Sequence, residues 1–136
     1  MVAGLALTTS APADARAACT TTQLTDTAEG FSRSTSISAD GSRIAFISTS
    51  DFTGGNGDHS REIFLSDASD GTLTQITDTT SAVPLIHFDV SADGSHVVLS
   101  ADFDPAGDNA DGNNEVFLVD TTDGTTTQVT DTTGGE

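Results

Sequence analysis

Two loops rich in acidic side chains hold most of the residues of this chain that could bind a ligand. The longer one, residues 102–115, is dense in Asp and Asn, and these side chains supply the hard oxygen ligands that Ca²⁺ prefers. The loop is not an EF-hand: with Asp104 counted first, Ala106 and Asn109 stand where a ligand and a glycine are needed. We expect a loop whose side chains bond its own backbone, with a weak calcium site as the alternative. The candidate calcium ligands are Asp104, Asp108, Asp111, Asn113 and Glu115.

A shorter loop, residues 51–62, offers a similar set of oxygen ligands. It contains Asp51, Asn56, Asp58 and Glu62, interrupted by His59 and Arg61. Glu62 and Glu115 end the two loops at equivalent places, and the later pair Asp67 and Asp120 also recurs. Because a residue that recurs once per repeat usually serves the repeated fold, we expect structural roles for all four.

Catalytic patterns are missing from the sequence. The three histidines, His59, His87 and His96, do not have the spacing of a zinc site. Serine is abundant, yet no Gly-x-Ser-x-Gly elbow occurs, nor does a phosphate loop or a dinucleotide fingerprint. The sequence therefore predicts a protein without catalytic residues and without a cofactor other than the possible Ca²⁺.

Three motifs repeat along the chain with a constant spacing. Ser-Ala-Asp-Gly-Ser at 38–42 recurs 53 residues later at 91–95, and Glu-Ile-Phe-Leu-Ser-Asp at 62–67 recurs as Glu-Val-Phe-Leu-Val-Asp at 115–120. Thr-Gln-x-Thr-Asp-Thr occurs three times, at residues 22–27, 74–79 and 127–132. The chain therefore holds two full copies of one unit, preceded by an unaccompanied copy of its last segment.

Each unit divides into four expected strands. The first strands lie near 34–38 and 88–91, and an Asp-Gly turn leads to the second at 43–48 and 96–101. The third strands, 62–67 and 115–120, share with the second a run of consecutive apolar residues, which predicts burial on both faces of the sheet. The fourth strand, Thr-Gln-x-Thr, is mostly polar and is expected at the outer edge. The fold class is thus all-β, with four-stranded antiparallel sheets.

The three motifs together resemble the WD40-like propeller repeat of TolB-type proteins, with Ala39 and Ala92 in place of the usual proline. The resemblance covers residues 20–133 and implies propeller blades at 28–80 and 81–133. It also implies a non-catalytic scaffold that recognises proteins or peptides at one propeller face. An alternative is the non-catalytic propeller of a larger exported enzyme, such as a prolyl-oligopeptidase-type serine peptidase. A further alternative is a Ca²⁺-stabilised repeat of a surface protein.

Two blades do not make a propeller, which uses about four to eight. Residues 20–27 are expected to be the outer strand of a preceding or closing blade, and residues 134–136 the start of a missing one. We favour an open fragment of a longer propeller over a complete chain whose copies associate into a ring.

In an up-and-down blade, the loop between the second and third strands lies on the same face as the link to the next blade. That face would collect the two acidic loops and the links 26–33 and 78–84, and long loops on a rigid scaffold are where binding usually occurs. The candidate binding residues there are Asp51, Asn56, Asp58, Glu62, Asp102, Asp104, Asp108, Asp111, Asn113 and Glu115.

The charge balance excludes some classes of partner. Four Arg and no Lys face 21 acidic residues, for a formal net charge of −17. Nucleic acid and anionic membrane surfaces are disfavoured, because binding to phosphate needs clustered basic side chains. Solubility is the favoured reason for the acidity, ahead of cation binding.

The N-terminal 17 residues have the features of an export signal that lacks its basic start. A short apolar run at 2–7 is followed by three Ala-x-Ala sites, the last at 15–17. Cys19 is the only cysteine, so an internal disulfide is impossible, and Arg16 disfavours a lipid anchor at Cys19. We expect a periplasmic or extracellular protein without a membrane span.

Overall fold

A computed structural model describes residues 19–80 and 87–133 of the chain. The expected export signal at 1–17 and the expected start of a further blade at 134–136 lie outside these residues. The eight strands are β1 (Ser32–Ile37), β2 (Arg43–Ser48), β3 (Glu62–Asp67), β4 (Leu73–Gln75), β5 (His87–Val90), β6 (His96–Ala101), β7 (Glu115–Asp120) and β8 (Thr126–Gln128). In this part of the chain, no helix has the length and apolar character needed to cross a membrane.

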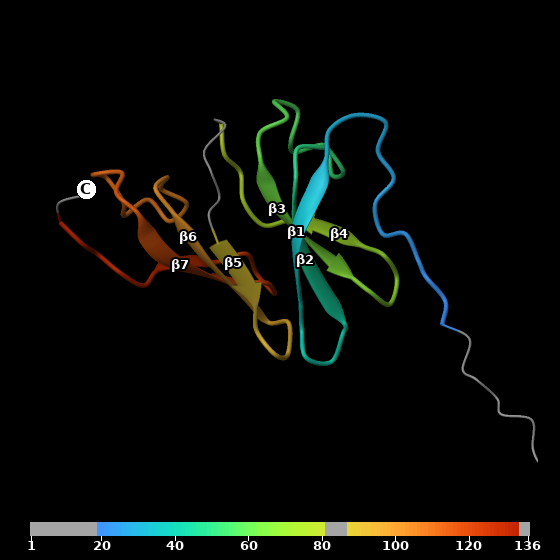
Figure 1. The fold of residues 1–136 in the computed structure, drawn as a ribbon. Helices are drawn as coiled ribbons and strands as arrows, with labels where there is room; N and C mark the ends of the chain where they lie inside the picture. Colours follow the sequence, from blue (N-terminus) through green and yellow to red (C-terminus); the bar gives the residue numbers. More distant parts are fainter. Residues whose placement is uncertain (1–18, 81–86, 134–136) are drawn as a thin grey trace, which may run out of the picture.

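The strands form two four-stranded antiparallel sheets, as predicted (Figure 1). The first sheet has the order β1-β2-β3-β4 and the second β5-β6-β7-β8. Their registers match: Arg43 pairs with Asp67 across β2 and β3, and 53 residues later His96 pairs with Asp120 across β6 and β7. The all-β class and the four strands per repeat are thus confirmed, while the described residues form no closed ring.

The Ser-Ala-Asp-Gly-Ser motif builds the hairpin between the first two strands of each sheet. Asp40 Oδ1 accepts hydrogen bonds from the Ser38 hydroxyl at 2.7 Å, the Ser42 amide at 2.9 Å and the Ser42 hydroxyl at 2.8 Å. Gly41 has a φ of 74°, in the left-handed region that glycine adopts at little cost. Asp93 makes the same three contacts in the second sheet. The motif therefore forms a turn whose polar groups hydrogen-bond one another. This structural role explains why the motif recurs in each sheet.

The two sheets pack against each other through one face each, which we call their contact faces. Alternate residues of β2 and β3 supply the contact face of the first sheet, and β6 and β7 supply that of the second. The members are Ala45, Ile47, Ile63 and Leu65 in the first sheet and Val97, Leu99, Ala101, Phe117 and Val119 in the second, and all belong to one buried cluster. β5 lies beside β1 and β2 (Figure 1). The Ala39 amide donates to the Ala92 carbonyl at 2.9 Å, and the Ser36 hydroxyl donates to the Asp89 carboxylate.

The opposite faces, here called the open faces, differ between the two sheets. On the first sheet, Phe46 and Phe64 are buried under Phe52 of the loop, whose ring lies 5.9 and 5.1 Å from theirs. On the second sheet, buried and more exposed residues alternate along β6 and β7. Burial on both faces, expected in both repeats, is therefore right for β2 and β3 and wrong for β6 and β7. The two open faces differ because Phe52 covers that of the first sheet, whereas Val98 stays exposed on that of the second.

The expected outer strand at 20–27 has no strand structure, and the segment runs away from both sheets (Figure 1). A β-strand needs an adjacent edge to satisfy its backbone groups, and residues 20–27 pair with no edge in the described chain. The assignment of this segment to a preceding or closing blade stays a prediction.

The contact between the sheets can be tested at two equivalent glycines. Gly41 and Gly94 have φ values of 74° and 73°, so alanine at either should cost about 1–2 kcal/mol of stability for the left-handed backbone. A Cβ at Gly94 would also lie 2.3 Å from Arg43 Cγ of the first sheet, whereas at Gly41 nothing lies within 4 Å. Urea unfolding should therefore show a larger loss for Gly94→Ala than for Gly41→Ala. Equal losses would contradict this packing.

The two hairpin carboxylates should make stability fall in acid. The Ser38 hydroxyl lowers the pKa of Asp40 to about 2, and the Ser91 hydroxyl likewise holds the pKa of Asp93 well below its usual range. Because both values lie below that of the unfolded chain, the free energy of unfolding should decrease as the pH falls from about 4 to about 2.

Asp40→Asn combined with Asp93→Asn should flatten this acid dependence in denaturant titrations at fixed pH. Asp26→Asn with Glu29→Gln removes the same net charge from a segment outside both sheets and serves as the control. An unchanged slope in the hairpin variant would refute the assignment.

Candidate functional site

The two long loops lie at the same end of the two sheets, opposite the hairpins of the first strand pairs (Figure 1). One spans residues 49–61 between β2 and β3, and the other spans 102–114 between β6 and β7. This placement follows from the antiparallel order of the strands. It brings the candidate binding residues to one end of the molecule, as the repeat predicted.

Each loop is held by an aspartate at its start. Asp51 Oδ1 accepts hydrogen bonds from the amides of Gly54 at 2.7 Å and Asn56 at 3.1 Å. In the second loop, Asp104 makes the equivalent contacts to the amides of Gly107 at 2.7 Å and Asn109 at 2.9 Å. The Asn56 amide lowers the pKa of Asp51 through this bond. These two carboxylates therefore shape the loops by bonding the backbone around them.

A buried asparagine holds the middle of each loop. Asn56 and Asn109 are 1% and 4% exposed. The Asn56 side-chain amide donates to the Ser60 carbonyl at 3.1 Å, and the Asn109 amide donates to the Asn113 carbonyl at 2.9 Å. Both residues serve the loop conformation, and their burial leaves little of either side chain for a ligand.

A buried glutamate ends each loop and joins it to the segment after the fourth strand. The Glu62 carboxylate, 0% exposed, accepts hydrogen bonds from the hydroxyls of Ser60, Thr77 and Thr79. It also accepts one from the Thr79 amide at 2.8 Å. We call this set, Ser60, Glu62, Thr77 and Thr79, the Glu–Thr cluster of the first sheet.

The second sheet has the same cluster, formed by Asn113, Glu115, Thr130 and Thr132. The hydroxyls of Thr130 and Thr132 donate to the Glu115 carboxylate, and the Thr132 amide donates to it at 2.7 Å. The Thr130 hydroxyl is the main reason that the pKa of Glu115 is lowered. Asn113 donates to the Thr132 carbonyl, as Ser60 does to that of Thr79. The recurring Glu and Thr-Asp-Thr motifs are thus two halves of one cluster.

The ten candidate binding residues therefore divide into two groups. Six of them hold the loops, because they bond other parts of their own loop or cluster: Asp51, Asn56, Glu62, Asp104, Asn113 and Glu115. The other four, Asp58, Asp102, Asp108 and Asp111, are exposed. Asp58 and Asp111 each accept one hydrogen bond within their own loop, from the Ser60 amide and the Asn113 side chain. Within the described chain, Asp102 and Asp108 take part in no side-chain hydrogen bond, so their carboxylates are available to a partner.

The structure does not gather the candidate calcium ligands into one site. In the described residues, no group of three or more His, Cys, Asp or Glu side chains could hold a metal ion. Asp104, Asn113 and Glu115 point their polar atoms at the loop backbone or the Glu–Thr cluster. Calcium binding by this loop stays a prediction, and the geometry adds no support to it.

A polar hollow lies beside the first loop. It is lined by Thr53, Gly54, Gly55, Gln75, Ile76, Thr77 and Asp78. Thr53 donates to Gln75 Oε1 at 3.2 Å, and a Cβ on Gly55 would meet the same oxygen at 2.9 Å. The loop therefore closes onto β4 and leaves a shallow polar surface that includes the exposed Asp78. The sequence did not predict this hollow, because Gln75 belongs to the repeated motif and a structural role was expected for it.

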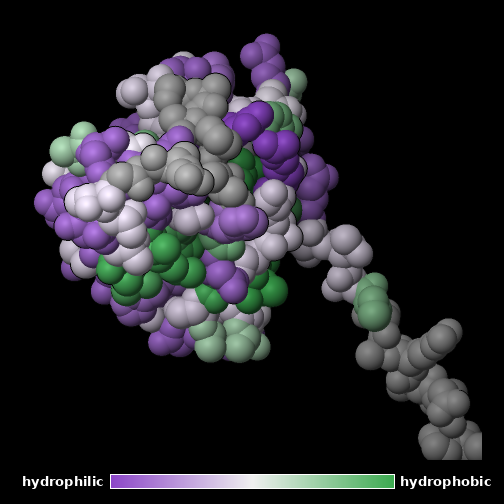
Figure 2. All heavy atoms as spheres, turned by 60° about the vertical axis from the view of Figure 1, so that its left-hand side comes forward, coloured by the Kyte–Doolittle hydropathy of each residue, from purple (hydrophilic) through white to green (hydrophobic). Residues whose placement is uncertain are grey.

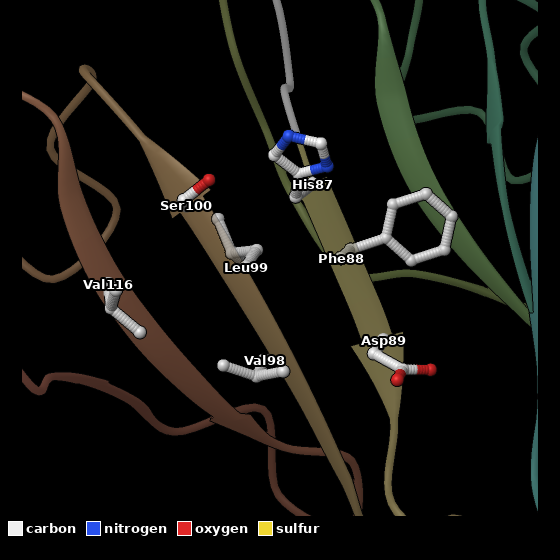
Figure 3. A pocket seen from close by; sticks show the side chains of 7 residues that line it. All are labelled: His87, Phe88, Asp89, Val98, Leu99, Ser100 and Val116. Carbon is white, nitrogen blue, oxygen red and sulfur yellow. The ribbon is translucent and has the colours of Figure 1, made fainter.

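A second hollow of about 200 Å³ lies on the second sheet and was not predicted. Figure 2 shows hydrophobic residues gathered in a patch on the side of the molecule that comes forward there. Figure 3 shows the side chains that line the hollow, carried by β5, β6 and β7. They are His87, Phe88, Asp89, Val98, Leu99, Ser100 and Val116. The apolar run of β6 indicated an apolar face at this place, but it predicted that the face would be covered and not open.

Comparisons with known proteins do not assign the chain to a family. No family model matches it, and no curated protein matches it. The class that the structure defines is therefore an all-β protein of two repeated four-stranded antiparallel sheets.

The Glu–Thr cluster can be tested by removing one carboxylate. Glu62→Ala removes the buried carboxylate to which the Thr77 hydroxyl and the Thr79 amide donate, which should cost about 3 kcal/mol of stability. Glu29→Ala removes the same charge from an exposed position and should change stability by less than about 0.5 kcal/mol. Chemical denaturation measures both. Equal effects would mean that Glu62 does not hold the loop.

Proposed function

We propose that this chain is an exported segment of a TolB-like β-propeller that acts as a non-catalytic binding scaffold. In this proposal the two sheets are neighbouring blades, and their long-loop end recognises a protein or peptide that presents basic side chains. The observation that carries it is the pair of loops at one end, each fixed by its own aspartate, asparagine and glutamate.

Rigid loops favour recognition because little conformational entropy is lost when they bind. The loops keep their shape through buried contacts, while Asp58, Asp102, Asp108 and Asp111 stay exposed. Exposed carboxylates on a chain with a formal net charge of −17 attract cationic groups. The polar hollow between the first loop and β4 adds hydrogen-bonding groups from Thr53 and Gln75.

The blade assignment has separate support. The sheets are four-stranded, antiparallel and repeated at a fixed spacing, and they pack face to face. Repeat units of this kind cannot bury both faces alone and are stable when stacked. The hairpin, glutamate and Thr-Gln motifs through which the sequence resembles TolB-type propellers all have structural roles in the sheets.

Selection from a random peptide library against the immobilised chain tests the proposal. We expect peptides rich in Arg or Lys. For a selected peptide, Asp102→Asn with Asp108→Asn should weaken binding about tenfold, because two exposed ion pairs are lost.

The matched control is Asp70→Asn with Asp123→Asn, which removes the same charge from the turns at the opposite end. Asn keeps the Oδ1 acceptor that each turn uses for Thr72 or Thr125. Fluorescence anisotropy should show binding within about twofold of the parent chain. Equal weakening by both pairs would mean that peptides respond only to net charge, which would overturn the loop-end site.

A further inference from the structure

The two sheets pack head to tail, which means that the first sheet uses one face of the repeated unit for the contact and the second sheet uses the other. Ala45 and Leu65 of the first contact face correspond, 53 residues later, to Val98 and Leu118, which lie on the open face of the second sheet. Conversely, Leu99 and Phe117 of the second contact face correspond to Phe46 and Phe64 on the open face of the first. Each open face is thus the repeat counterpart of a face that is already paired in this chain.

The exposed apolar side chains mark these same positions. Val98 is 39% exposed, and its counterpart Ala45 is fully buried in the core cluster. Val129 is 59% exposed, while its counterpart Ile76 packs against that cluster. On the open face of the first sheet, Ile37 is 60% exposed, whereas its counterpart Val90 belongs to the core cluster. Three of the exposed large apolar residues are therefore residues whose repeat equivalents are covered by a neighbouring sheet.

We infer that a second copy of this chain covers the open face of the second sheet with the open face of its own first sheet. This contact between copies would repeat the contact between the two sheets within the chain. Val98 and Val129 of one copy would face the open face of the next copy's first sheet, where Ile37 lies. The same relation would bring the Ala92 amide of one copy to the Ala39 carbonyl of the next, as the Ala39 amide meets the Ala92 carbonyl within the chain. The hollow of about 200 Å³ beside Val98 and Val116 is space that such a neighbour would fill.

This interface is heterologous, so it forms either a closed ring or an open filament. Closed rings of four-stranded blades contain about four to eight of them, and the described residues of each copy supply two sheets. Rings of two, three or four copies are therefore expected. The inference goes beyond the proposed binding function. In such a ring, the long-loop ends of all copies would lie on the same side.

Charge sets the condition for association. Each copy has a formal net charge of −17, and the contact surfaces are apolar, so copies repel at low ionic strength and attract only at short range. Salt shortens the Debye length from about 10 Å at 0.1 M to about 3 Å at 1 M. Association should therefore strengthen as salt is raised, whereas an interface held by ion pairs would weaken.

Sedimentation velocity of the full chain, over a range of protein concentrations at 0.1 M and 1 M NaCl, tests the inference. We expect a species of two to four chains that increases with salt. A chain that stays monomeric at every concentration and both salt levels overturns it, as does an assembly that dissociates when salt is added.

Two variants then test the direction of packing. Val98→Glu places a charge on the open face of the second sheet, and Ile37→Glu places one on that of the first; each should weaken association at least about a hundredfold. Thr125→Glu adds the same charge in an exposed turn and should associate like the parent chain. Circular dichroism checks that all three are folded.

Mixing the two variants gives the decisive result. The intact second sheet of Ile37→Glu can still bind the intact first sheet of Val98→Glu, so the mixture should form a one-to-one pair although each variant alone is monomeric. Failure of the mixture to pair, while the parent chain associates, would overturn the head-to-tail interface. The peptide-binding test of the loop end is unaffected by either outcome.

Discussion

A carboxylate buried without a basic partner is costly unless several hydrogen-bond donors surround it. Glu62 and Glu115 meet this requirement with threonine hydroxyls and a threonine amide. The donors come from the segment after the fourth strand, and the glutamates begin the third strand, immediately after the long loop. Satisfying the buried charge therefore fixes three parts of each sheet at once. The rest of the structure depends on this constraint, because it determines where each loop ends and where the chain leaves the sheet.

The arrangement of the loops follows from that constraint. With the end of each loop held by a Glu–Thr cluster, Asp51 and Asn56, or Asp104 and Asn109, can organise the residues in between. These side chains bond their own loops, so fewer of the loop residues can bind a ligand than the acidic composition of the loops suggests. Asp102 and Asp108, which hold no part of the loops, are exposed, and they are the carboxylates that the proposed cationic partner would contact.

The apolar faces of the sheets differ from the buried carboxylates, because they are only partly covered. Packing the first sheet on the second buries ten residues in one cluster, yet it leaves one face of each sheet without a neighbouring sheet in the described chain. Phe52 covers part of the first, while Val98 stays exposed on the second. In the inferred assembly, the acidity of the chain would keep such faces apart at low salt, so its composition would set when copies associate.

The sequence by itself determined the fold class, the strands of both sheets to within one or two residues, and the structural role of the repeated motifs. It could do so because turn chemistry and apolar runs are local, and because a second copy of each motif confirmed the first. It did not reveal that Glu62 meets Thr77 and Thr79, since that contact joins segments 15 and 17 residues apart. Nor did it show that the same apolar pattern is covered in β2 and open in β6. Only the tertiary structure decided this, because burial depends on which neighbour lies against a face and not on the residues of the face alone.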